Sequence, residues 1–181
     1  MNEIERLYLA DLRERLAKLR ETAERAIAQT SGEHFVAAPD AGTNSIAITV
    51  KHVAGNLRSR FTGFMVTDGE KPDRDRDGEF ELTPDDTRDA LMERWAEGWR
   101  LLITALDSLQ PEDLTRTLQI RREPHSVLGA LNRNFGHLAY HVGQIVLLAK
   151  HYAGPVAWQT LTIPRAAPRA VPSTPPTSPA R

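Results

Sequence analysis

The sequence predicts an all-α protein, a four-helix bundle, on the strength of three observations. Four long stretches repeat apolar residues at three- and four-residue spacings, as amphipathic helices do. Turn residues separate these stretches, and only one short segment alternates apolar and polar residues. At 181 residues the chain is long enough to bury a core. We expect one domain over residues 1–155.

The first two predicted helices are bounded by turn and capping residues. The first covers Glu3 to Gln29 and contains no proline or glycine. Asn44 or Ser45 can cap the second helix, which runs to about Met65. Gly55 within it is a poor helix former and indicates either a close backbone approach or simple tolerance.

A long polar loop, Thr67 to Leu82, separates the second and third predicted helices. Such a long connection suits a lid, or an ion-paired link between the two helices. The third helix is predicted to begin at Thr83 as the cap, with Pro84 at its first position, and to end near Leu109.

Three further segments complete the chain. Residues 114–122 alternate apolar and polar residues, which predicts a short strand or an extended segment. The fourth helix is predicted to start over residues 123–126 and to continue to about Tyr152. Residues 156–181 are rich in proline and lack periodicity, so we expect a largely disordered tail, at least past Arg165.

Composition excludes several classes of function. A net charge of −1 gives no electrostatic reason for binding nucleic acid or an anionic membrane. No apolar run of membrane-spanning length and no signal peptide is apparent, so we expect a cytoplasmic protein. The chain has no cysteine, which excludes thiolate catalysis and cysteine zinc sites. Any metal ligands must therefore be histidine, aspartate or glutamate.

Three histidines are the candidate metal ligands. His137 and His141 are four residues apart on the fourth helix, so both imidazoles point to the same, largely apolar face. His52 lies at the edge of the apolar stripe of the second helix and would complete a three-histidine site with an open position. The alternative is that these rings are exposed or are hydrogen-bonded core residues.

Two motifs carry a resemblance to a known family. The second helix reads H-V-A-G-N-L-R-S-R from His52, and the fourth reads G-H-L-A-Y-H-V-G-Q-I from Gly136. The second helix is followed by D-G-E-K-P, from Asp68 to Pro72. Over residues 1–155 the chain resembles the DinB-like (YfiT-like) superfamily, and within it a branch of uncharacterised bacterial proteins.

The resemblance implies a fold, a cofactor and an activity. The implied fold is an up-down-down-up bundle that holds a divalent ion, commonly zinc or nickel, on three histidines. Carried over by position, these are His52, His137 and His141. Members with known activity are metal-dependent transferases or isomerases that use a low-molecular-weight thiol, and many are homodimers. The implied partners are thus a small-molecule substrate, a thiol cosubstrate and a second copy of the chain.

Other polar residues near the predicted site have candidate roles. Gln144 and Asn56 could each hydrogen-bond a bound group, because each lies within about two turns of a candidate ligand. Arg60, and less favourably Arg58, could bind a carboxylate of a substrate or thiol. For the arginines, the alternative is a solvated helix surface or a salt bridge to the acidic loop.

Two functional hypotheses follow. The first is an enzyme that performs thiol-dependent transfer or hydrolysis, in which the ion activates a thiol or water. The second is a non-catalytic metal-binding or dimerising bundle of a stress response, whose ion only stabilises the fold. A bundle that binds no metal is a third possibility. An open coordination position would favour the enzyme.

Overall fold

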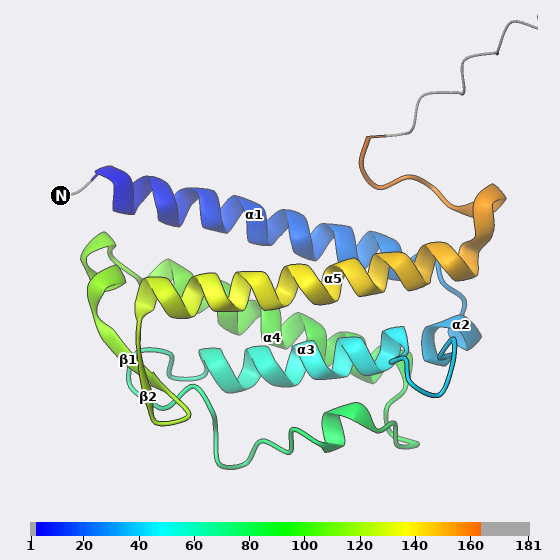
Figure 1. The fold of residues 1–181 in the computed structure, drawn as a ribbon, viewed down its shortest axis with the longest axis horizontal. Coiled ribbons are helices and arrows are strands. Elements are labelled where there is room, and N and C mark those ends of the chain that lie inside the picture. Colours follow the sequence, from blue (N-terminus) through cyan, green and yellow to red (C-terminus); the bar gives the residue numbers. More distant parts are fainter. Residues whose placement is uncertain (1–2, 164–181) are drawn as a thin grey trace, which may run out of the picture.

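A computed structural model of the protein describes residues 3–163, and this part of the chain is mostly helical (Figure 1). The predicted all-α class is therefore confirmed. The long helices are α1 (Glu3–Ile27), α3 (Ile46–Phe61), α4 (Arg88–Ser108) and α5 (Val127–Ala157). The predicted disorder past Arg165 concerns residues outside the described part.

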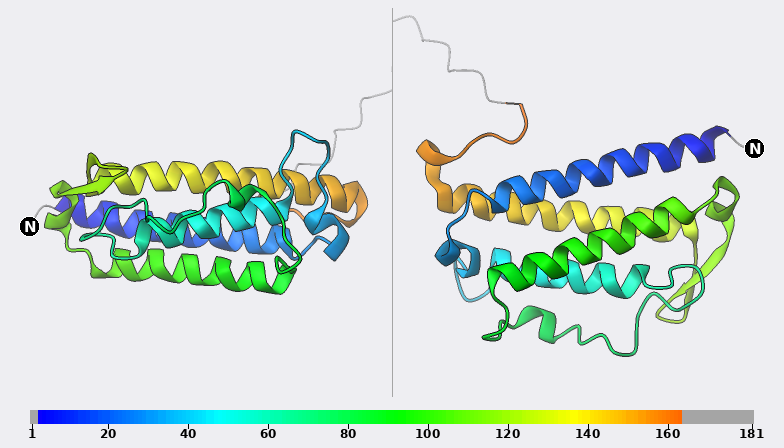
Figure 2. Two further views of the ribbon diagram at one scale, coloured as in Figure 1. Left: turned by 90° about the horizontal axis from the view of Figure 1, so that it is seen from below. Right: turned by 180° about the vertical axis from the view of Figure 1, so that it is seen from behind.

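The four long helices lie side by side along the longest axis of the molecule. The chain colours in Figures 1 and 2 show that α1 and α5 run in one direction and that α3 and α4 run in the other. Helix α3 packs mainly against α4, and α1 packs mainly against α5. Helix α3 also packs against α5, and this contact brings His52 beside the two histidines of α5.

The starts of the long helices depend on their capping residues. Ser45, one of the two predicted caps, accepts a hydrogen bond from the amide of Ile48 and begins α3. The predicted cap of α4 is wrong, because Thr87 and not Thr83 accepts from the first turn. The amide and hydroxyl of Thr83 both donate to Asp86 instead, which closes a turn before the helix.

The ends of α3 and α5 also differ from the prediction. Helix α3 ends at Phe61 rather than near Met65, before Gly63 with its φ of 59°. Helix α5 continues beyond the predicted end at Tyr152, to Ala157, with a kink at Gly154 (φ 72°). The predicted domain boundary at residue 155 stays a prediction.

The short elements lie at the two ends of the molecule and along the loop (Figure 1). Sequence patterns did not predict the short helices α2 (Gly32–Val36), η1 (Gly78–Phe80) and η2 (Pro111–Thr115), and residues 123–126 were expected to start the last helix. These residues instead form a strand that pairs antiparallel with the segment before it. The two strands are β1 (Thr117–Ile120) and β2 (Glu123–Ser126).

The turn between β1 and β2 is held from a distant part of the chain. Arg121 and Arg122 both have positive φ, 56° and 64°. These angles suit a two-residue hairpin turn, but they are sterically unfavourable for residues other than glycine. The carboxylate of Asp68 accepts hydrogen bonds from both of their amides, at 2.8 and 2.7 Å. These hydrogen bonds satisfy both amide donors of the exposed turn, and they hold the hairpin beside the end of α3.

The core fills the space between the four long helices. Its largest side chains, Trp95 and Trp99 of α4, are fully buried. Burying an aromatic or aliphatic side chain of this kind stabilises the fold by roughly 1.5–3 kcal/mol. Within the described residues, no helix combines the length and apolar character that a membrane span requires.

Candidate metal centre

The three predicted histidines meet between α3 and α5. The Nε2 atom of His137 is 3.1 Å from Nε2 of His52 and 3.1 Å from Nε2 of His141. One ring nitrogen from each histidine lies within 4.8 Å of the other two, a grouping that could hold a metal ion. The structure thus brings together three residues that the sequence predicted to share a site.

The helices and the loop around the histidines exclude most solvent from them. His52 is buried on the inner face of α3, and the ring of Phe80 packs against it at a centroid distance of 4.7 Å. His137 and His141 lie on successive turns of α5 and are half-buried. Polar nitrogens at such a depth need hydrogen-bond partners or an ion.

Two of the three rings have an acceptor at the nitrogen that faces away from the cluster. Nδ1 of His52 is 2.8 Å from Oε2 of Glu79, and Nδ1 of His141 is 2.8 Å from Oε1 of Gln144. A carboxylate and an amide oxygen only accept, so both Nδ1 atoms carry the hydrogen. In the neutral rings the converging Nε2 atoms are then bare lone pairs.

The central ring cannot satisfy both of its neighbours. His137 can donate at most one hydrogen from Nε2, so at least one of its two 3.1 Å contacts has no hydrogen between the two nitrogens. Its Nδ1 atom is buried and has no hydrogen-bond partner among residues 3–163. This donor set is electrostatically incomplete, and a cation at the point of convergence would complete it.

The protonation states suit a cation site. Burial, reinforced by the nearby His141, His52 and arginines, lowers the pKa of His137 to about 3. Burial also lowers the pKa of His141, against the opposing effect of its hydrogen bond with Gln144. Both rings are therefore neutral near pH 7, which is the form that binds a metal ion.

A buried ion pair fixes the acceptor of His52. Arg74 donates two parallel hydrogen bonds of 2.8 Å to the carboxylate of Glu79. Their side chains are only 4% and 8% exposed. Burial alone would raise the pKa of Glu79, but the hydrogen bonds from His52 and Arg74 outweigh it and lower the pKa. Glu79 is therefore ionised and holds the His52 ring in one orientation.

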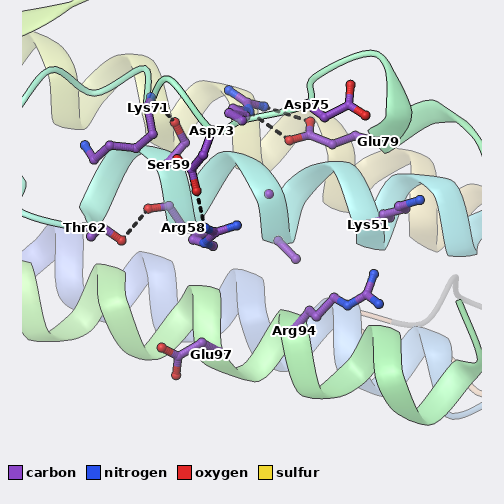
Figure 3. A pocket seen from close by; sticks show the side chains of 13 residues that line it. Lys51, Arg58, Ser59, Thr62, Lys71, Asp73, Asp75, Glu79, Arg94 and Glu97 are labelled. Atoms are coloured by element: carbon purple, nitrogen blue, oxygen red, sulfur yellow. Dashed lines mark hydrogen bonds and ion pairs between the residues drawn. The ribbon is translucent and has the colours of Figure 1, made fainter. Parts of the chain in front are cut away.

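Glu79 reaches His52 by crossing α3 over a glycine. Figure 3 shows Glu79 on the loop side of α3, facing the helix. A Cβ atom added at Gly55 would overlap the Glu79 carboxylate. The sequence left open whether Gly55 marks a close approach or simple tolerance, and the structure shows a close approach.

The comparisons with known proteins give a family. The family model described as "Protein of unknown function (DUF1572)" matches residues 3–167. The chain belongs to the DUF1572 family. Neither the curated proteins nor the solved structures yield a match. The matched region of this DUF1572 chain contains the four long helices and all three histidines.

The DUF1572 chain places the other predicted site residues around the cluster. Gln144 lies on the outer side of His141, with its Oε1 atom 2.8 Å from Nδ1 of that ring. Asn56 accepts a long hydrogen bond, 3.4 Å, from Asn134 of α5. Arg60 pairs with Glu70 at 3.1 Å and donates to the carbonyl oxygen of Gly69 at 2.6 Å.

Glu79 and Arg74 of this DUF1572 chain could not be recognised as site residues from the sequence. Both lie in the polar loop, which contains many acids and arginines, so no local pattern singles them out. The available signal was Gly55, three residues after His52, for which a close approach to the helix was one of the two interpretations. Arg58 pairs with Asp73 of the loop at 2.6 Å, a salt bridge of the kind given as the alternative for the arginines.

Two hollows flank the Glu79–Arg74 pair in the DUF1572 chain. A cavity of about 200 Å³ lies beside His52 and His137 on one side. A larger hollow of about 540 Å³ lies between α3, the loop and α4, and is lined by Glu79 (Figure 3). Arg74 lines both hollows, so the buried ion pair separates the cavity beside the histidines from the larger hollow between α3, the loop and α4.

Proposed function

We propose that His52, His137 and His141 hold a divalent metal ion, with zinc and nickel as the first candidates, in an enzyme of the DinB-like superfamily. One observation carries the proposal: three Nε2 atoms converge while the outer nitrogens of two rings are already engaged. Under this proposal the four long helices form the up-down-down-up bundle of that superfamily.

The surrounding residues support the ligand role of the histidines. Glu79 and Gln144 each accept from an outer Nδ1–H, an arrangement that orients metal-binding imidazoles and raises their basicity. Arg74 holds Glu79 in place. When bound, the ion supplies Lewis acidity, which makes a thiol or water a better nucleophile near neutral pH.

The cavity beside the histidines favours an enzyme over a purely structural ion. Closed structural sites have four protein ligands, whereas catalytic sites keep a position open. Here the group that could hold a metal consists of three residues within the described part, and the cavity reaches two of them, His52 and His137. We therefore propose thiol-dependent transfer or hydrolysis, with a small-molecule substrate and a low-molecular-weight thiol as cosubstrate.

Elemental analysis of untagged protein tests the ion. We expect about one zinc or nickel ion per chain in the wild type, as for a three-histidine site. His52→Ala and His137→Ala should each lose it, whereas His151→Ala, an exposed histidine of α5, should retain it. A wild type that takes up no metal after dialysis against zinc, nickel and manganese would refute the proposal.

A second measurement separates the enzyme from a non-catalytic metal protein. Metal-loaded protein is screened with small thiols and electrophilic acceptors, and with ester substrates. Turnover that follows metal content and disappears in His137→Ala supports the enzyme. Full metal occupancy without turnover supports the non-catalytic alternative. The homodimer is part of the same proposal, and sedimentation velocity tests it directly.

A further inference from the structure

The cavity beside the histidines is lined by many arginines and by no acidic residue. Its wall also includes the amides of Asn56 and Asn134, which offer neutral polar groups. The arginines come from α3, the polar loop, the hairpin turn and α5, so distant parts of the chain place their charges around one space. They are Arg60, Arg74, Arg76, Arg121 and Arg133.

One carboxylate that does not line the cavity forms ion pairs with three of these arginines. Glu70 lies 3.1 Å from Arg60, 3.2 Å from Arg74 and 3.1 Å from Arg121. Burial raises the pKa of Glu70, but these guanidinium groups together lower it below its usual value. Glu70 is therefore ionised, and it neutralises only part of the charge around it.

Of the remaining two arginines, one has a long ion pair and the other has none among the described residues. Arg133 is exposed and has no hydrogen bond or ion pair to another residue in the described part of the chain. Arg76 lies 3.8 Å from Asp77 and over the ring of Phe80. Within residues 3–163, the five lining arginines thus form ion pairs with only three carboxylates, those of Glu70, Glu79 and Asp77. The cavity has an excess of positive charge.

The size of the cavity limits the ligand. Its volume is about 200 Å³, below the roughly 300–1,000 Å³ of pockets for drug-sized ligands. A guanidinium binds an oxyanion through parallel N–H donors, which gives geometry as well as attraction. A small molecule with one oxyanion group fits both the volume and the charge.

We propose that this cavity binds the oxyanion group of a small substrate, a carboxylate or a phosphate, with Arg133 as the residue that engages it. The rest of the substrate then lies against His52 and His137, which line the same space. The inference rests on the proposed function, since it names the substrate class of that site. The anion-binding step itself requires only the arginines.

Titration of metal-free protein by NMR tests the anion site. Inorganic phosphate and sodium acetate are added in parallel at constant ionic strength, with acetamide as the neutral probe. We expect saturable shifts of backbone amides around the cavity, such as Ile120, Ala130 and Asn134, for one or both anions and none for acetamide. The anion that binds more tightly identifies the carboxylate or the phosphate as the natural group.

Two charge-matched variants decide whether the cavity is responsible. Arg133→Gln should weaken anion binding at least tenfold, and it should fold normally because Arg133 is exposed and unpaired. Arg6→Gln removes the same charge from an exposed position of α1 outside this cavity and should leave binding unchanged. Equal weakening by both variants would show a general charge effect and overturn the inference.

The outcome is independent of the test for the metal. Protein that holds a metal ion yet shows no saturable shift with either anion would overturn this inference and leave the proposed function intact. Anion binding in a chain that takes up no metal would support the inference and refute the metal proposal.

Discussion

The carboxylate of Glu79 lies directly over Gly55, so close that a Cβ atom at that position would overlap it. Glu79 and Gly55 thereby set how near the polar loop can approach α3. At this separation the carboxylate reaches Nδ1 of His52 at 2.8 Å and still accepts both hydrogen bonds from Arg74. The orientation of a candidate metal ligand therefore depends on the absence of one side chain.

Replacement of Gly55 by alanine should displace Glu79 from His52. The added methyl group occupies the place of the carboxylate. We expect metal affinity to fall about 10–100-fold, as when such an outer partner is lost. Competition with a chromophoric chelator measures this. Gly143→Ala is the control, because a Cβ atom there has no neighbour within 4 Å. Equal affinities for both variants would contradict the role of the contact.

Replacement of Glu79 by glutamine tests the charge rather than the space. The amide keeps the size of the side chain but removes the negative charge that pairs with Arg74 and faces Nδ1 of His52. We expect a loss of metal affinity of about 10–100-fold and a lower melting temperature. Glu81→Gln, at an exposed position of the same loop, should change neither. Unchanged affinity in Glu79→Gln would show that the ion pair is only structural.

Asp86 should make the free energy of unfolding depend on pH in the acid range. Burial raises its pKa, but hydrogen bonds from Lys51, Thr83 and Arg94 outweigh it and hold the pKa far below the usual value. The folded state then binds fewer protons than the unfolded state, so this stability is present above about pH 4 and is lost as the pH falls. Asp86→Asn should cost about 1–3 kcal/mol at pH 7.

Urea unfolding of wild type and Asp86→Asn between about pH 7 and pH 2 measures this dependence. The two stability curves should converge as the pH falls. Asp107→Asn removes an ion pair with Arg13 in which Asp107 is 62% exposed, and it should cost less than about 1 kcal/mol. Parallel curves for wild type and Asp86→Asn would show that Asp86 does not titrate as described.

The hairpin turn offers a test of backbone strain. Arg122 is exposed and has a φ of 64°, which glycine adopts freely and which a β-branched side chain resists. Arg122→Gly should be as stable as the wild type or more so. Arg122→Val should be less stable than the wild type, because branching at Cβ adds to the steric cost that Arg122 already bears in this conformation. Thermal unfolding of the three proteins gives the order, and a more stable valine variant would contradict the strain.

Local patterns predicted the helices well, because an amphipathic stripe records which face each helix buries. They failed where a distant residue decides the structure. Thr83 and Thr87 are both acceptable caps by sequence, but Asp86 is held by Lys51 and Arg94, so Thr83 bonds to Asp86 and the helix starts later. The second strand depends on Asp68, which is more than 50 positions from the turn that it holds.

In the candidate site, too, local patterns predicted some residues, whereas others depend on contacts between distant parts of the chain. The pairing of His137 with His141 follows from helical spacing alone. The addition of His52 needed its place on an apolar face, together with the resemblance to the DinB-like superfamily. Glu79 could not be chosen from the sequence, because its neighbours in the loop are equally acidic and only the folded chain shows which one crosses Gly55.

His52 and His137 are 85 positions apart in the chain, yet their ring nitrogens are 3.1 Å from each other. An ion held by both would act as a reversible cross-link and close the unfolded chain into a long loop, at an entropic cost that grows only slowly with loop length. Such a link would tie the opening of α3 to that of α5. Amide hydrogens of the two helices would then exchange with solvent as one cooperative unit, and chelation would let each helix open separately.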